Sequence, residues 1–227
     1  MVFLDMKQIM MKRKIVFSLL LLPLMLIGCF ELPITADTFA WIREERLLFK
    51  DTFAENSGGW KTHEDTLSYA GYQEGGFRLW ADVPNYQFWS VPGLNFRDTQ
   101  VVARARVLAG PDDNMFGLLC RYQDENNYYA LVIGADGYYG IFKNLDGEHS
   151  LIDQQHMDFS EEINRGKNEN KLQAVCQNDH LSLFVNGTML LQVQDESLAY
   201  GDIGLIVGNF AESGVDVLFD DFIVVSP

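Results

Sequence analysis

Residues 115–143 (MFGLLCRYQDENNYYALVIGADGYYGIFK) constrain the fold more than any other part of the chain. They contain three apolar runs, at residues 115–122, 127–135 and 138–143, separated only by short polar breaks. Runs of this kind, rich in Val, Ile, Tyr and Phe and broken by Asp-Gly, are typical of antiparallel strands joined by hairpins. Alternate side chains of a strand point to opposite faces, and here both faces are largely apolar. We therefore expect this meander at the centre of a β-sandwich, in a sheet covered on at least one side.

The chain after residue 46 continues with short strand patterns between turn residues. The other predicted strands are residues 47–53, 76–81, 86–91, 99–109, 149–152, 171–177, 181–185, 188–193, 201–208 and 215–225. Within residues 99–109, alternation directs Val101 and Ala103 inward and Arg104 outward. Asn186-Gly187 is the strongest hairpin signal, because a type I′ turn needs positive φ at both central positions. About a dozen such strands with almost no helix predict an all-β fold, a two-sheet antiparallel β-sandwich.

The N-terminal segment has the pattern of a targeting sequence. Lys12-Arg13-Lys14 is followed by the apolar residues 15–27, a stretch too short to span a bilayer comfortably as a helix. Leu26-Ile27-Gly28-Cys29 resembles the lipobox of bacterial lipoproteins, where signal peptidase II cleaves before the cysteine. The resemblance implies a lipid on Cys29; the alternative is an ordinary secretory signal with a chance cysteine.

This pattern divides the chain into three parts and predicts a location. We expect a lipoprotein signal peptide at residues 1–28, a lipidated tether at residues 29–46 and a β-sandwich domain at residues 47–227. The protein would be anchored by its lipid to the cell membrane or outer membrane, with the domain facing outside the cytoplasm.

The charge balance excludes one class of partner. The chain has 17 basic and 32 acidic residues, and removal of residues 1–28 leaves 13 basic and 31 acidic, a formal charge of −18. Such a surface repels nucleic acid and anionic headgroups. We therefore expect no nucleic-acid partner, and membrane attachment through the lipid anchor only.

Two cysteines, Cys120 and Cys176, remain after Cys29 is assigned to the lipid. An even pair in strand-like runs of an exported protein predicts a disulfide. Closing this loop of 57 residues stabilises the fold by roughly 4 kcal/mol on the chain-entropy model. The alternative is two separately buried thiols.

The order of several short motifs resembles the concanavalin A-like lectin/glucanase superfamily, which includes laminin-G-like and 3-keto-disaccharide hydrolase-like domains. The matching motifs are Asp51-Thr52-Phe53 followed by Gly59-Trp60, Gly75-Gly76-Phe77-Arg78-Leu79, residues 117–122 with Asn127-Tyr128-Tyr129, Asp136-Gly137-Tyr138-Tyr139, residues 181–185 with Asn186-Gly187, and residues 201–205 and 217–222. The resemblance covers residues 47–227 and implies a jelly roll whose first and last strands lie side by side. It says little about activity, because a fold of this kind hosts many functions.

A catalytic motif is not recognised in the sequence. A retaining glycosidase of this superfamily needs two carboxyl groups about 5 Å apart, and the expected carboxylate run does not occur. Asp216, Asp220 and Asp221 come nearest to it, but solvated or turn-anchoring carboxylates explain them as well. The four histidines lack the spacing of metal ligands.

The sequence requires no cofactor, but it contains candidate calcium ligands. If the terminal strands are neighbours, Asp51, Asp220 and Asp221 could supply oxygen atoms to Ca²⁺ where those strands meet. The alternative is that Asp220 only accepts backbone N–H groups and fixes the loop before Trp60.

Exposed aromatic rings that stack on sugars, with planar polar groups for hydroxyls, are the features expected of a carbohydrate-binding platform. We predict that five residues form a concave platform of this kind: Arg78, Trp80, Trp89, Arg121 and Tyr138. The competing interpretation is that the tryptophans pack in the sandwich and Arg121 pairs with a carboxylate. The function we expect is a lipid-anchored module that binds a glycan or another cell-envelope component. The alternatives are a 3-keto-disaccharide-type glycoside hydrolase and a non-catalytic protein-interaction domain.

Overall fold

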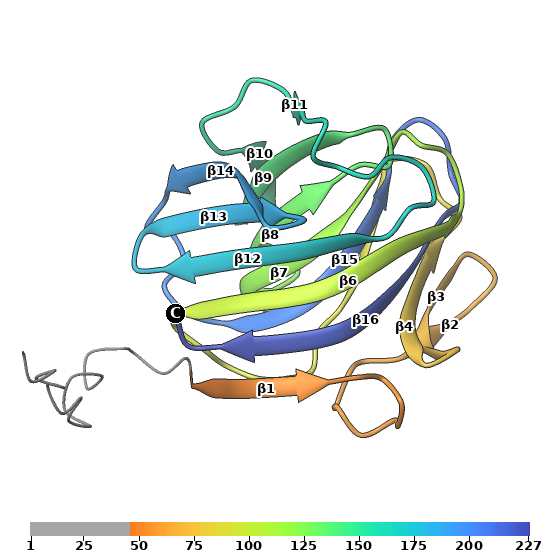
Figure 1. Cartoon of the computed structure of the whole chain (residues 1–227), viewed down its shortest axis with the longest axis horizontal. Coiled ribbons are helices and arrows are strands. Elements are labelled where there is room, and N and C mark those ends of the chain that lie inside the picture. Colours follow the sequence, from red (N-terminus) through yellow and green to blue (C-terminus); the bar gives the residue numbers. More distant parts are fainter. Residues whose placement is uncertain (1–45) are drawn as a thin grey trace, which may run out of the picture. The chain divides into compact units, whose positions relative to one another are not determined.

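The computed structural model describes residues 46–227 (Figure 1). The predicted signal peptide, Cys29 and the tether lie outside these residues, except for Arg46. The described part is an all-β sandwich of two antiparallel sheets, as the sequence predicts. It contains no helix that is long and apolar enough to cross a bilayer.

The first sheet has nine strands in the order β14-β13-β12-β6-β16-β4-β3-β2, and β1 also pairs with β16. Their bounds are β1 (Leu47–Asp51), β2 (His63–Glu64), β3 (Ser68–Gln73), β4 (Gly76–Ala81), β6 (Thr99–Ala109), β12 (Asn170–Gln177), β13 (His180–Val185), β14 (Thr188–Gln194) and β16 (Val215–Val225).

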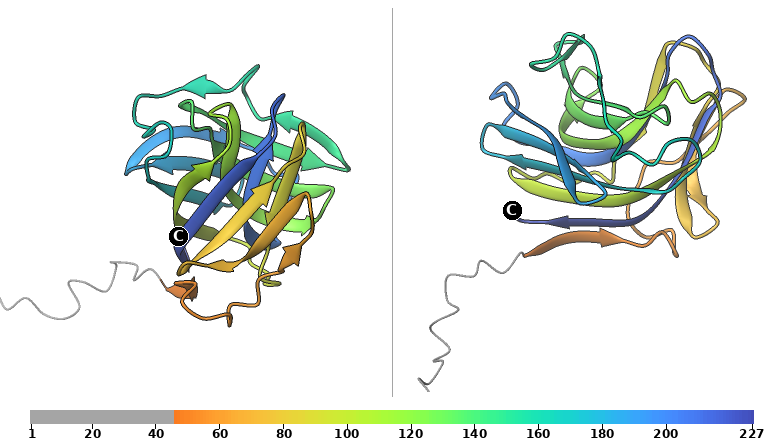
Figure 2. Two further views of the ribbon diagram at one scale, coloured as in Figure 1. Left: turned by 90° about the vertical axis from the view of Figure 1, so that its right-hand side faces the viewer. Right: turned by 45° about the horizontal axis from the view of Figure 1, so that its top comes forward.

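The second sheet has seven strands in the order β10-β9-β8-β7-β15-β5, and β11 pairs with β9. Their bounds are β5 (Tyr86–Ser90), β7 (Asn114–Asp124), β8 (Asn127–Ile133), β9 (Tyr138–Leu145), β10 (Glu148–Leu151), β11 (Asp158–Phe159) and β15 (Asp202–Asn209). Figure 2 shows the two layers from two further directions. The meander predicted from residues 115–143 is β7-β8-β9, in the middle of this sheet.

The main core lies between the sheets and follows the predicted alternation. On β6, Val101 and Ala103 are fully buried whereas Arg104 and Arg106 are exposed. β16 pairs with β4 in its first half and with β1 in its second half, across a register shift. The first and last strands are therefore neighbours, as the resemblance implied.

Cys120 on β7 and Cys176 on β12 form the predicted disulfide, with their Cα atoms 6.7 Å apart. Because β7 belongs to the second sheet and β12 to the first, the bond links the two layers through the core. Both cysteine residues are fully buried.

A second apolar cluster lies on the other face of the second sheet, away from the first sheet. Its buried members are Val91, Met115, Leu119, Tyr128, Ala130, Val132 and Ile206. Trp89, Tyr122 and Phe142 pack against it and remain partly exposed. This face, which we call the outer face of the second sheet, holds the candidate site.

Candidate functional site

The second sheet curls until side chains of its two edge strands touch. Gln87 on β5 and His149 on β10 lie on opposite edges, with β9, β8, β7 and β15 between them. In a flat sheet the edge backbones would be about 24 Å apart, because adjacent strands are about 4.8 Å apart. Nevertheless Gln87 Nε2 and His149 Nε2 are 3.0 Å apart. The outer face is therefore strongly concave.

Three aromatic rings from three strands form a cluster on this concave face. Trp89 lies 5.6 Å from Tyr128 and 6.2 Å from Tyr122, measured between ring centroids, and the two tyrosine rings stack at 6.0 Å. Phe142 stacks on His149 at 4.7 Å. Beside this cluster the strands pack closely, since a Cβ on Gly204 would lie 2.8 Å from Val91 Cγ1.

A chain of hydrogen bonds crosses the cluster. The Tyr128 hydroxyl donates to Gln87 Oε1 at 2.8 Å, and the Gln87 amide nitrogen then faces His149. Burial raises the pKa of Tyr128 and lowers the pKa of His149, so both side chains favour their neutral forms. A neutral imidazole has one nitrogen that can accept this hydrogen bond.

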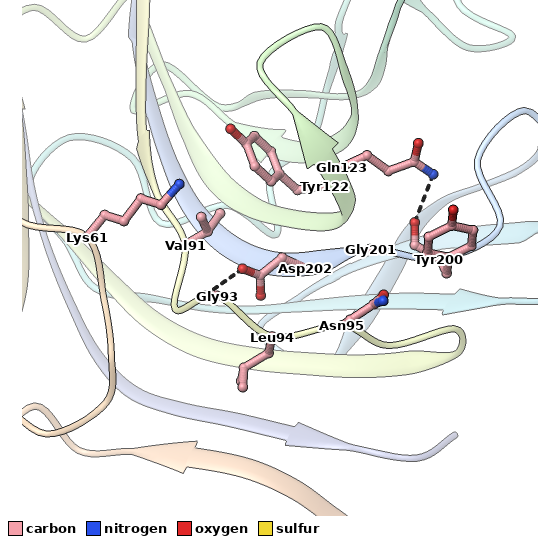
Figure 3. Close-up of a pocket in the computed structure, with 10 residues that line it drawn as sticks. All are labelled: Lys61, Val91, Gly93, Leu94, Asn95, Tyr122, Gln123, Tyr200, Gly201 and Asp202. Atoms are coloured by element: carbon pink, nitrogen blue, oxygen red, sulfur yellow. Dashed lines mark hydrogen bonds between the residues drawn. The ribbon is translucent and has the colours of Figure 1, made fainter.

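A pocket of about 490 Å³ opens beside Tyr122 (Figure 3). Asp202 lies at its centre, Lys61 on one side, and Asn95, Gln123 and Tyr200 on the other. The Gln123 amide donates to the carbonyl oxygen of Tyr200 at 3.1 Å. The lining thus combines aromatic rings with amide, ammonium and carboxylate groups, an arrangement suited to a ligand that carries many hydroxyls.

Asp202 is buried and mainly holds the backbone in place. Its Oδ2 accepts the N–H of Gly93 at 2.7 Å and its Oδ1 accepts the N–H of Ile203 at 2.8 Å. Burial raises the pKa of this carboxyl above its ordinary value, although those backbone donors act in the opposite direction. Among the described residues that line the pocket, Asp202 is the one with a carboxylate. Glycoside hydrolysis normally uses a pair of carboxyl groups.

Arg121 does not reach the surface, so its predicted place on an open platform is wrong. Its side chain is 2% exposed and lies at a register shift of β7, where its φ is +52°. The guanidinium donates to the carbonyl oxygens of Leu198 at 2.8 Å and Asn178 at 2.6 Å, and it also contacts Asp98. Arg121 therefore fixes the loops around the pocket instead of contacting a ligand there.

Arg78 and Trp80 lie on β4 of the first sheet, whereas Trp89 and Tyr138 belong to the second. Arg78 makes a bidentate pair with Asp216, with both N···O distances at 2.7 Å, and a third bond to Gln73 at 3.0 Å. Its guanidinium also lies over the ring of Tyr69. The structure thus does not bring the five predicted residues together: Trp89 alone of the five belongs to the aromatic cluster.

Tyr138 is 43% exposed and packs edge-on against Phe159, at 5.6 Å between ring centroids. It lines a separate pocket of about 440 Å³ with Asp113, Asp136 and Phe210. A sugar contact at Tyr138 stays a prediction.

The predicted calcium ligands do not converge. Asp51 accepts hydrogen bonds from the N–H of Phe53 at 2.7 Å and from Trp60 Nε1 at 3.1 Å, while Asp221 pairs with Arg104 at 3.2 Å. Within residues 46–227, no group of three or more His, Cys, Asp or Glu residues is placed to hold a metal ion. Calcium binding stays a prediction that this geometry does not support.

Sequence reasoning missed Lys61, Asp202 and His149 as parts of this face. No local motif marks them, because each reaches the site through a strand pairing or a loop distant in sequence. Alternation within single strands also does not show that Tyr128 on β8 and Gln87 on β5 share one face of the sheet.

No protein-family model and no curated protein sequence matches this chain. Solved structures do match. The carbohydrate-binding module CBM66 from Bacillus subtilis has a TM-score of 0.61 and 17% identity, over 75% of this chain and 98% of the module. A Bacillus subtilis protein of unknown function with a galectin-like fold has a TM-score of 0.59 and 12% identity, over 81% of this chain and 97% of that protein.

The GH43 protein BlXynB from Bacillus licheniformis has a TM-score of 0.58 and 14% identity, over 78% of this chain and 39% of that protein. At such low identities these similarities establish the fold alone, a two-sheet jelly-roll β-sandwich.

Proposed function

We propose that this protein is a glycan-binding module whose ligand lies on the concave outer face of the second sheet. The observation that carries the proposal is the position of Trp89, half-buried against Tyr122 and Tyr128, of which Tyr122 also lines the polar pocket around Asp202. A sugar ring has an apolar C–H face and a rim of hydroxyls, so it fits an aromatic ring bordered by hydrogen-bonding groups. The resemblance in fold to a carbohydrate-binding module and to a GH43 protein supports this proposal.

The same proposal includes a lipid anchor at Cys29. The lipobox-like residues 26–29 and the apolar segment before them support it. With a formal charge of −18 after residue 28, the domain repels anionic headgroups, so the acyl chains must supply the attachment. The module would then present its concave face outside the cytoplasm, to glycans or other cell-envelope components.

A glycan array tests the function, with two tryptophan variants to locate the site. The purified protein is expected to bind a restricted set of glycans, and Trp89→Ala is expected to lose about five- to thirtyfold in affinity, because a buried stacking contact contributes about 1–2 kcal/mol. Trp80→Ala is the matched control, since Trp80 is also half-buried but lies on the first sheet.

Two outcomes would contradict the proposal. The first is an array with no bound glycan. The second is a loss of affinity in Trp80→Ala that equals the loss in Trp89→Ala, because the ligand would then not be confined to the concave face.

A further inference from the structure

One buried acceptor on the concave face has no partner. Within residues 46–227, Asn144 Oδ1 is the single buried side-chain nitrogen or oxygen atom without a hydrogen bond, and Asn144 is 8% exposed. Its Nδ2 donates to the carbonyl oxygen of Glu125 at 2.9 Å, which fixes the orientation of the amide. Buried acceptors are nearly always satisfied, so this oxygen needs a donor that the closed structure does not supply.

The residue opposite Asn144 on the edge strand is an exposed histidine, His149. Asn144 is paired in register with His149 of β10 on one side and with Tyr128 of β8 on the other. Because His149 Nε2 faces the amide nitrogen of Gln87 and must accept, the imidazole proton is on Nδ1. No residue in the described part of the chain accepts a hydrogen bond from Nδ1.

The contact between Gln87 and His149, which joins the two edges of the sheet, is made by side chains alone. β5 pairs only with β15, and β10 pairs only with β9, so no backbone ladder joins the two edges. The Gln87–His149 hydrogen bond is solvent-exposed. It can therefore open without the loss of any strand pairing.

We propose that the Gln87–His149 contact is the closed state of a hydroxyl-binding subsite, and that a vicinal diol opens it and takes its place. One hydroxyl donates to Asn144 Oδ1, and its neighbour accepts from the imidazole of His149. This inference rests on the proposed glycan binding and adds a second point of recognition beside Trp89. It identifies the ligand class as a polyol with adjacent free hydroxyls, such as an unsubstituted sugar ring.

The test follows side-chain resonances of the ¹⁵N-labelled protein by NMR during titration with erythritol, a small vicinal polyol. The side-chain amides of Asn144 and Gln87 are expected to shift together and to saturate, whereas ethanol, with a single hydroxyl, is expected to cause only linear drift. His149→Phe keeps a ring stacked on Phe142 but removes both nitrogens. It should raise the half-saturation concentration about tenfold, as expected for the loss of a hydrogen bond.

Two further variants keep the test decisive. Asn144→Leu removes the acceptor at nearly constant volume and should have the same effect as His149→Phe. His180→Phe is the matched control, because His180 makes the same kind of contact with Gln194 at 3.0 Å but lies on β13 of the first sheet. It should leave the titration unchanged.

The subsite is overturned if erythritol produces no saturable shift at Asn144 and Gln87, or if ethanol or His180→Phe gives the same curves. That result would leave the glycan array and the effect of Trp89→Ala unaffected. Conversely, saturable erythritol binding together with an empty array would support the subsite and contradict the broader glycan-binding function.

Discussion

Arg121 Nη1 donates to the carbonyl oxygen of Leu198 across 2.8 Å, and this buried contact ties the segment before Tyr200 to β7. A second guanidinium nitrogen reaches the carbonyl oxygen of Asn178, just after β12. Cys120, the preceding residue, is bonded to Cys176. One end of the sandwich is therefore fixed by two adjacent residues of β7, and the pocket around Asp202 lies at that end.

Replacement of Arg121 should weaken the whole domain. Arg121→Lys keeps the charge but loses the planar fork, leaving carbonyl oxygens of Leu198 and Asn178 without their donors. We expect the free energy of unfolding to fall by about 2–4 kcal/mol, as measured by urea denaturation. Arg106→Lys, at an exposed position of β6, is the control; equal small losses in both variants would contradict the role of Arg121.

Removal of the disulfide should also destabilise the protein. The double variant Cys120→Ala, Cys176→Ala is expected to lose about 2–4 kcal/mol in guanidinium denaturation, because the unfolded chain regains the freedom of a long loop. The wild-type protein with its disulfide reduced should behave in the same way. A midpoint that does not change in either experiment would show that the link between the sheets adds nothing.

The lowered pKa of Asp195 leads us to expect that the protein loses stability in acid. Burial alone would raise the pKa of this carboxyl, but hydrogen bonds from Lys143, Tyr129 and Ser197 outweigh burial and lower the pKa to about 2, from an ordinary value of 3.8. Since the folded pKa lies below the unfolded one, the stabilisation is complete above the unfolded pKa and is lost as the pH falls toward the folded pKa.

This pH dependence is checked against Asp195→Asn. The stability advantage of the wild type over this variant, measured by urea denaturation, should be constant between about pH 5 and pH 7 and should shrink at about pH 2.5. An advantage that grew on acidification would contradict the assignment.

Substitution of Cys29 tests the proposed lipid anchor. Cys29→Ser should release the protein from the membrane fraction into the soluble fraction, because it removes the proposed lipidation site and the acidic domain repels anionic headgroups. A variant that stays in the membrane pellet would show that something other than lipidation holds the protein there.

Most of the fold could be predicted from the pattern of apolar residues and turn residues along the chain. Alternation on β6 placed Val101 in the core and Arg104 outside, and Asn186-Gly187 does form a turn with φ of +53° and +93°. The alternation of apolar and polar residues is set by local sequence, so it could be predicted. The disulfide could be predicted too, because only one pair of cysteines remained.

The site could not be predicted in the same way. Strict alternation would put Arg121 on the face opposite Cys120, but the register shift and the positive φ of Arg121 turn its side chain into the protein. Trp80 and Trp89 both lie in short strands, and only the pairing of β4 with β16 and of β5 with β15 assigns them to different sheets. The local sequence of a strand does not show which distant strand it pairs with.

The function proposed for this protein is to bind a glycan on the concave face of the second sheet. A crystal structure of the protein with the best-bound glycan from the array tests it most directly. We expect a sugar ring against Trp89 and Tyr122, with hydroxyls in the pocket around Asp202. A glycan seated instead on the first sheet, beside Trp80, would contradict it.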